Sequence, residues 1–169
     1  GGSAGALSRP ASAAPAGDSA AVINTRLNAR YMLMSSRAGR ERPACNAKRV
    51  IGVESSPSAC EDFAFNLDEF DHVELYEGLA EEVIPHLEAK PEIVLVDPPR
   101  AGLEKRVVDG ILNLKPQIVA YVSCDPATQM RDLRLFMGAG YELIAAQPFD
   151  LFPQTRHLEC VLTLRRKLE

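Results

Sequence analysis

The stretch Glu92-Ile-Val-Leu-Val-Asp97, followed by Pro98-Pro99-Arg100, decides the fold of this chain. A short run of apolar and β-branched residues that is bounded by turn residues is typical of a buried strand. The two prolines end that strand, because proline has no backbone N–H to donate to a sheet. The segment Gln117–Ser123 repeats the pattern and leads into Cys124-Asp125-Pro126. Both predicted strands therefore carry polar or reactive side chains just after their carboxyl ends.

Similar strands alternate with helices from Lys48 onward. We predict strands over 49–54, 72–77, 92–97, 117–123, 141–147 and 157–164, and helices over 56–70, 79–89, 104–114 and 126–137. Strands and helices that alternate in this way form a parallel sheet with right-handed crossovers. The last two strands have no helix between them, so they should form a hairpin and one antiparallel edge. Ligands of such sheets bind at the carboxyl ends of the strands.

The first 47 residues lack this regularity. Residues 1–20 are rich in Gly, Ala, Ser and Pro, which is typical of a disordered tail or linker. A strand would fit Ala21–Leu27 and a short helix would fit Leu27–Met34, but the stretch that follows, from Ser35 to Pro43, favours neither. The scarcity of acids also resembles a transit peptide, whereas the leading Gly-Gly favours a remnant of expression.

Composition and charge set further bounds. With 46% hydrophobic and 25% charged residues, the chain matches a soluble globular protein. The four cysteines form no Cys-x-x-Cys pair and no metal-ligand spacing with the three histidines. We therefore expect a reducing, cytoplasmic compartment, no bound metal and no membrane span. The net charge of −4 is unfavourable for a nucleic-acid binder, which needs concentrated Lys and Arg.

Three motifs resemble the RNA (uracil-C5)-methyltransferases. They are Asp97–Leu103 (DPPRAGL), Tyr121–Thr128 (YVSCDPAT) and Phe149–Cys160 (FDLFPQTRHLEC), in the order and at the spacing of that family. The resemblance covers roughly residues 48–166. It implies a Rossmann-like class I methyltransferase, an α/β fold with a mostly parallel sheet, helices on both faces and an antiparallel last strand. It also implies S-adenosyl-L-methionine as the cofactor and tRNA or rRNA as the substrate.

The reaction of that family needs a protein nucleophile, because carbon 5 of uracil is a poor one. A thiolate that adds to carbon 6 makes carbon 5 carbanion-like, and a base later removes the carbon-5 proton. The resemblance assigns the nucleophile to Cys124 and the base to Glu159, with Asp97 near the cofactor and the target base. The residues alone leave Cys124 as a small buried hydrophobe and Glu159 as a solvent-facing edge acid. A position before a helix that opens at Pro126 favours a reactive thiol, and Cys160 is expected to pack in the core.

Other residues are candidates for binding. Glu54 ends a predicted strand, where an acid accepts hydrogen bonds from both ribose hydroxyls of a nucleoside cofactor or simply precedes a helix. The resemblance gives Arg100 a role in fixing the active loop or the nucleotide. The resemblance also places Gln154 and Thr155 in the loop that precedes the general base Glu159, where Gln154 would form a hydrogen bond to the edge of a nucleobase. Phe152 would stack on a nucleobase or pack in the core.

The chain departs from the family pattern on the N-terminal side. A Gly-rich loop of the form Asp-x-x-x-Gly-x-Gly should precede Lys48, but the window Asn28–Arg42 has one glycine and no aspartate. We therefore expect the first strand and the Gly-rich loop to be atypical or missing. Residues 21–47 would form an atypical segment, and 48–167 the catalytic domain.

These departures leave several hypotheses open. A shifted reading frame across residues 28–47 would account for the lost loop. One alternative function is a non-catalytic or truncated methyltransferase-like domain that binds no cofactor. Another is a thiol hydrolase that uses Cys124 with His157. A missing first strand would also expose a sheet edge, through which the chain would form homo-oligomers.

Overall fold

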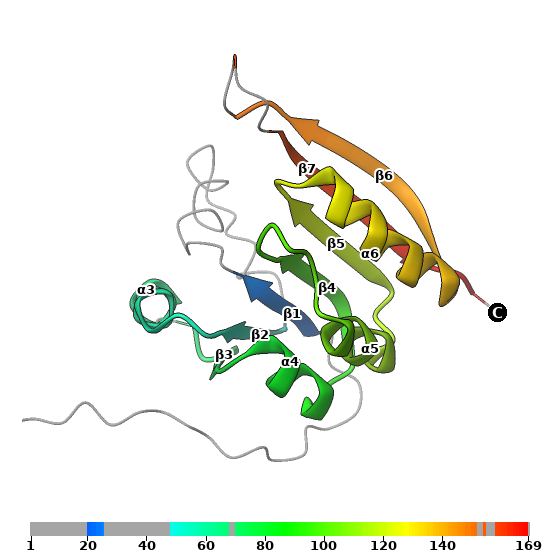
Figure 1. Cartoon of the computed structure of the whole chain (residues 1–169). Helices are drawn as coiled ribbons and strands as arrows, with labels where there is room; N and C mark the ends of the chain where they lie inside the picture. Colours follow the sequence, from blue (N-terminus) through cyan, green and yellow to red (C-terminus); the bar gives the residue numbers. More distant parts are fainter. Residues whose placement is uncertain (1–19, 26–47, 68–69, 152–153, 155–157, 169) are drawn as a thin grey trace, which may run out of the picture.

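The computed structural model describes residues 20–25, 48–67, 70–151, 154 and 158–168. A seven-stranded sheet with the order β3-β2-β1-β4-β5-β7-β6 runs through the molecule (Figure 1). Its strands are β1 (Ala20–Thr25), β2 (Arg49–Glu54), β3 (Val73–Glu77), β4 (Pro91–Asp97), β5 (Ile118–Ser123), β6 (Tyr141–Phe149) and β7 (Glu159–Arg166). The helices are α3 (Pro57–Leu67), α4 (Ala80–Val83), the 3₁₀ helix η2 (Ile84–His86), α5 (Lys105–Leu114) and α6 (Pro126–Gly138).

Strand β1 is an interior strand of the sheet and pairs in parallel with both β2 and β4. The strand proposed over Ala21–Leu27 is thus confirmed, and the expectation of a missing first strand is wrong. The run Ala20-Ala-Val-Ile23 is short but β-branched and apolar, which suits a position between two other strands. Residues 1–19 and 26–47, with the predicted linker, the Gly-rich loop and the reading-frame hypothesis, lie outside the described residues.

The predicted parallel sheet with an antiparallel end is confirmed. The pairs β1–β2, β1–β4, β2–β3 and β4–β5 are parallel, and β7 runs antiparallel to both β5 and β6. The predicted helix over 79–89 is wrong in part. It gives way at Ile84 to the 3₁₀ helix η2, since Pro85 has no N–H for an α-helical bond.

Helices α4, α5 and α6 cover one face of the sheet (Figure 1). Alternate strand residues face these helices and form the core: Ile51, Val53, Val94, Val96, Val119, Tyr121, Leu162 and Leu164. Helix α5 contributes Val107, Val108 and Ile111, which lie on one side of the helix. A Cβ atom on Gly110 would lie 2.9 Å from Ile84 Cγ2, so a glycine is what lets α5 approach η2.

Helix α3 packs on the opposite face, and helices on both faces are therefore confirmed. A Cβ atom on Gly52, which alternates with the core residues of β2, would lie 2.7 Å from the Phe63 ring of α3. We call the part of this face beyond α3 the open face; it carries Ile93, Leu95, Ile118, Ala120 and Val122. Ile93 is 45% exposed there.

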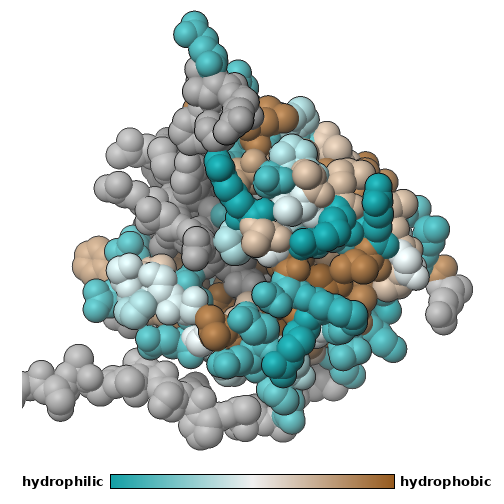
Figure 2. Space-filling model, viewed as in Figure 1, coloured by the Kyte–Doolittle hydropathy of each residue, from teal (hydrophilic) through white to brown (hydrophobic). Residues whose placement is uncertain are grey.

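Exposed hydrophobic side chains gather on α6 and β6. They include Met130, Leu135, Met137, Leu143, Ile144 and Phe149. Figure 2 shows hydrophobic residues along this side of the molecule, interspersed with hydrophilic ones. Among the described helices, none is long and apolar enough to cross a membrane.

Candidate active site

The three predicted catalytic residues lie at the same end of three neighbouring strands: Asp97 and Glu159 on β4 and β7, and Cys124 directly after β5. Asp97 is the last residue of β4, and Glu159 is the first residue of β7. Ser123 of β5 pairs with Cys160 of β7, so Cys124 and Glu159 are the next residues beyond the last pair of this antiparallel ladder. Because neighbouring strands are about 4.8 Å apart, the topology brings all three residues into one small region.

Asp97 and Glu159 also share the open face. Val96 precedes Asp97 and is buried against the helices, and Cys160 follows Glu159 and packs against the same core. Neighbouring strand residues point to opposite faces, which places both carboxyl groups away from the helices. The core position predicted for Cys160 is confirmed.

The two carboxyl groups interact. Burial, and after it the negative charge of Glu159, raise the pKa of Asp97 to about 6. Asp97 therefore holds a proton over part of the range near neutral pH, which an ordinary aspartate does not. A carboxyl group with a pKa shifted in this way is typical of a functional site.

The raised pKa predicts that ionised Asp97 destabilises the fold. The folded protein binds this proton more tightly than the unfolded chain, in which the pKa is near 3.8. Stability should therefore fall as the pH rises from about 4 through about 6. Asp97→Asn, which mimics the protonated acid, should be more stable than the parent at pH 7.5, and this gain should shrink at pH 5. Urea unfolding at both pH values measures it.

The exposed Asp71 provides the matched control. Asp71→Asn removes the same charge without relieving a buried carboxylate, so the parent and this variant should keep similar stabilities at both pH values. If Asp97→Asn were less stable than the parent at pH 7.5, the electrostatic description of this edge would be wrong.

Glu54 lies at the carboxyl end of β2 with one oxygen satisfied and one not. Its Oε1 accepts hydrogen bonds from the backbone N–H groups of Ser55 and Ser56, both at 2.7 Å. Its Oε2 is buried and has no partner among the described residues. A buried carboxylate oxygen without a donor is costly, so this atom fits a hydroxyl supplied by a ligand.

Cys124 directly precedes a well-capped helix. The Asp125 carboxylate accepts from the N–H groups of Ala127 and Thr128 at 3.0 and 3.1 Å, and Pro126 occupies the first turn of α6. The thiol is half-buried, whereas Cys60 is buried and Cys160 packs against the core. Burial raises the pKa of the Cys60 and Cys160 thiols, which disfavours their thiolates.

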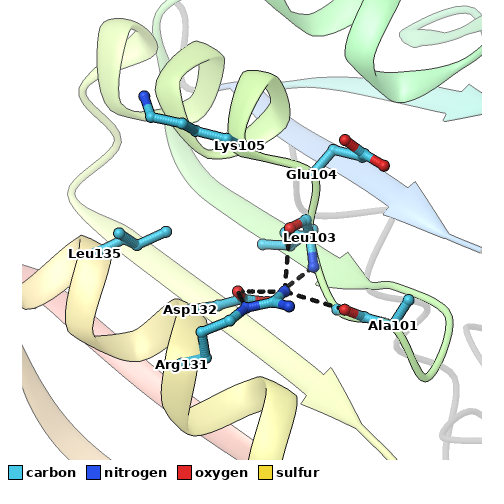
Figure 3. A pocket seen from close by; sticks show the side chains of 8 residues that line it. Ala101, Leu103, Glu104, Lys105, Arg131, Asp132 and Leu135 are labelled. Carbon is cyan, nitrogen blue, oxygen red and sulfur yellow. Dashed lines mark hydrogen bonds and ion pairs between the residues drawn. The ribbon is translucent and has the colours of Figure 1, made fainter.

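The loop that follows β4 is held by the helix that follows Cys124. Thr128 Oγ1 donates to the Arg100 carbonyl at 2.9 Å, and an Arg131 Nη donates to the Ala101 carbonyl at 3.0 Å. The Leu103 N–H donates to Asp132 Oδ2 at 2.8 Å (Figure 3). These bonds join the first motif to the second.

Asp132 is fully buried at the centre of this contact. Besides the Leu103 N–H it accepts from the Tyr121 hydroxyl at 2.7 Å and from Arg131 Nε at 2.8 Å. Burial and the Asp132 carboxylate raise the pKa of Tyr121, so its hydroxyl remains a donor. The sequence patterns did not predict a role for this aspartate. The one sequence signal is an acid directly before an apolar residue, Leu133, which the structure shows to be buried in α6.

Gly102 allows the loop to approach α6 closely. Its φ angle is +82°, and a Cβ atom there would lie 2.5 Å from Asp132 Oδ2. Gly102→Ala should therefore lower the free energy of unfolding by about 2 kcal/mol or more, through strain and displacement of the loop. Chemical denaturation measures the loss, and an unchanged stability would contradict the contact.

The same contact borders a hollow of about 460 Å³, lined by residues 101–105 with Arg131, Asp132 and Leu135 (Figure 3). Its lining does not include Asp97, Cys124 or Glu159. It lies on the helix-covered side of the sheet, so it is not where the three predicted catalytic residues meet.

The remaining predicted residues lie in loops or outside the part of the chain that the structure describes. Arg100 is exposed in the loop after β4, and Gln154 is exposed with a left-handed φ of 67°. Phe152, Thr155 and His157 lie outside the described residues. Among the residues that the structure describes, no group of three His, Cys, Asp or Glu side chains is placed to hold a metal ion.

Comparison with known proteins gives consistent matches. The family model described as tRNA (Uracil-5-)-methyltransferase matches residues 69–167. An uncharacterized RNA methyltransferase of Clostridium acetobutylicum is 44% identical over 126 residues, which cover 72% of this chain and 27% of the relative. An uncharacterized RNA methyltransferase of Halalkalibacterium halodurans is 44% identical over 129 residues, 73% of this chain and 28% of the relative. The chain thus spans about a quarter of the length of these relatives.

Solved structures agree on the fold. The tRNA (uracil-54, C5)-methyltransferase of Pyrococcus abyssi, in complex with S-adenosyl-L-homocysteine, has a TM-score of 0.65 and 28% identity. The match covers 88% of this chain and 34% of that one. The N-methyltransferase NodS of Bradyrhizobium japonicum has a TM-score of 0.68 at 10% identity, over 89% of this chain and 79% of that one, which shows the shared fold alone.

Proposed function

Because this chain belongs to the tRNA (uracil-5-)-methyltransferase family, we propose that it transfers a methyl group from S-adenosylmethionine to carbon 5 of a uridine in tRNA or rRNA. The observation that supports this proposal is the electrostatic contact of Asp97 with Glu159, at the end of the sheet where Cys124 follows β5. Residues 48–167 together with β1 form the catalytic domain in this account.

The residues of this edge suit a covalent mechanism. The Cys124 thiolate forms a bond to carbon 6 of uracil, and the electron pair moves onto carbon 5 as an enolate. S-adenosylmethionine would supply the electrophilic methyl group that carbon 5 accepts, with its sulfur–methyl bond breaking to release S-adenosylhomocysteine. Glu159 then removes the proton from carbon 5, and the carbon 6–sulfur bond breaks to restore the double bond and the thiolate.

Asp97 supports the same chemistry as a proton-carrying neighbour. A carboxyl group with a pKa of about 6 is protonated in part near neutral pH, so Asp97 is able to donate a hydrogen bond to the uracil ring while it lies close to Glu159. We propose Arg100, Gln154, Thr155 and Phe152 as contacts to the RNA. The free thiols of the described cysteines suit a reducing compartment, and we propose the cytoplasm.

Glu54 is the proposed ribose ligand of the cofactor. Its Oε2, which has no partner among the described residues, would accept from a ribose hydroxyl in a charge-assisted hydrogen bond. Glu54→Gln should weaken the binding of S-adenosylhomocysteine about tenfold or more, because such a bond contributes about 1.5–3 kcal/mol. Isothermal titration calorimetry measures the change. The exposed Glu88→Gln is the control, and equal affinities of parent and Glu54→Gln would remove Glu54 from the cofactor site.

Product analysis tests the reaction itself. The chain is incubated with labelled S-adenosylmethionine and unmodified tRNA or rRNA transcripts, which are then digested to nucleosides and separated by mass spectrometry. The proposal predicts label in 5-methyluridine. Label on a ribose, on a ring nitrogen or on another base would contradict it. So would the absence of transfer by a chain that is shown to bind both cofactor and RNA.

A further inference from the structure

Gln129 of α6 contacts the backbones of two neighbouring strands at once. Its side-chain nitrogen donates to the carbonyl of Tyr121 in β5 and to the carbonyl of Cys160 in β7, each at 3.0 Å. The residue is 2% exposed, so little water competes for these bonds. One side chain therefore ties together the strand that leads to Cys124 and the strand that begins with Glu159.

The two carbonyls belong to the last rungs of the β5–β7 ladder. This ladder ends with the pairs Tyr121–Leu162, Val122–Val161 and Ser123–Cys160. The side chain of Val122 points to the open face. The backbone at Val122 is therefore not covered by its own side chain on the helix side, where the Gln129 amide lies. Cys124 and Glu159 come next, beyond the last pair. Their separation therefore depends on how firmly these final rungs are held.

We infer, on the basis of the proposed function, that Gln129 is a positioning residue that sets the separation of Cys124 and Glu159. It touches neither substrate nor cofactor in this account. Its two donors close the end of the ladder from the helix side, where the strands would otherwise separate towards the loops. The nucleophile and the base are then presented at a constant distance to two neighbouring atoms of the same uracil, carbon 6 and carbon 5.

Disulfide trapping measures this separation without any methylation. Residues opposite one another in an antiparallel sheet have Cα atoms about 4.5–5.5 Å apart, within the range of a disulfide. In the Glu159→Cys variant, oxidised glutathione should therefore join the introduced thiol to Cys124, and peptide mapping should identify the bond. Adding Gln129→Met, which keeps a similar volume but no donor, should slow the formation of this bond about fivefold or more.

A matched control and a second variant complete the test. Gln117 is exposed directly before β5, at the end of the strand away from Cys124, and Gln117→Met should leave the rate of disulfide formation unchanged. Gln129→Glu keeps the shape of the side chain but has no donor when it is ionised. In the Gln129→Glu variant the disulfide should form more slowly than in the parent at pH 8. At acidic pH, where the carboxyl gains a proton, its rate relative to the parent at the same pH should recover. Equal rates with and without these changes at Gln129 would overturn the inference.

Turnover separates positioning from a purely structural role. Gln129→Met should lower kcat about tenfold while both KM values, for S-adenosylmethionine and for RNA, stay within about twofold. A variant that is less stable to heat but keeps the parental kcat would contradict positioning. If the parent itself does not methylate RNA, the proposed function fails, and the disulfide comparison still decides the role of Gln129.

Discussion

Cys124→Ala should lower the rate of uridine methylation by about 10⁴-fold or more, because it removes the atom that activates carbon 5. Cofactor binding should not change, since the thiol forms no part of the ribose site at Glu54. Single-turnover assays with labelled S-adenosylmethionine measure the rate, and calorimetry with S-adenosylhomocysteine measures the binding.

Cys60→Ala is the matched control for this variant. Cys60 is a buried residue of α3, and its thiol contacts the Glu54 carbonyl rather than the end of the β5–β7 ladder. Its loss should cost some stability but keep the rate within about threefold. A Cys124→Ala protein that keeps more than about one hundredth of the parental rate would show that the reaction does not proceed through this thiol.

Asp132→Ala should lower the free energy of unfolding by about 3 kcal/mol or more. The change leaves the Leu103 N–H and the Tyr121 hydroxyl buried without an acceptor, and each such group costs about 1–3 kcal/mol. It also removes the partner of Arg131, although that guanidinium is half-exposed and adds less. Urea unfolding with an unchanged slope measures the loss.

Asp109→Ala is the control for the buried acid. Asp109 is exposed on α5 and pairs with Lys105 one helical turn away, at 2.6 Å. An exposed pair of this kind contributes about 0.3–0.5 kcal/mol, so this variant should remain close to the parent. If Asp132→Ala were no more destabilising than Asp109→Ala, the contact between α6 and the loop after β4 would not stabilise the fold.

The sheet could be predicted because the strands follow simple patterns. β4 and β5 are apolar runs with sharp ends at Pro98 and at Cys124-Asp125, and their alternation with helices dictates parallel pairing. The hairpin of β6 and β7 followed from the absence of an intervening helix. In contrast, β1 has only a short apolar run after a Gly- and Ala-rich stretch, and its position depends on pairing with β2 and β4 rather than on local signals.

The site could be predicted only as far as strand ends and motifs allow. Asp97, Cys124 and Glu159 were predicted from these, and the register places the last two directly beyond the final pair of the β5–β7 ladder. Gln129 and Asp132 were not predicted, because polar residues within a helix normally face water. Their roles arise from tertiary contacts with carbonyls and N–H groups of distant segments, which sequence spacing does not reveal.

The most direct test of the central claim is mass spectrometry of the chain after reaction with RNA that contains 5-fluorouridine. Fluorine replaces the carbon-5 proton that Glu159 would remove, so the covalent intermediate cannot resolve. The account predicts a stable adduct in the presence of S-adenosylmethionine, with the methylated nucleotide attached to the Cys124 peptide and no adduct in Cys124→Ala. An adduct on Cys60 or Cys160, or product formation with no adduct at any cysteine, would contradict it.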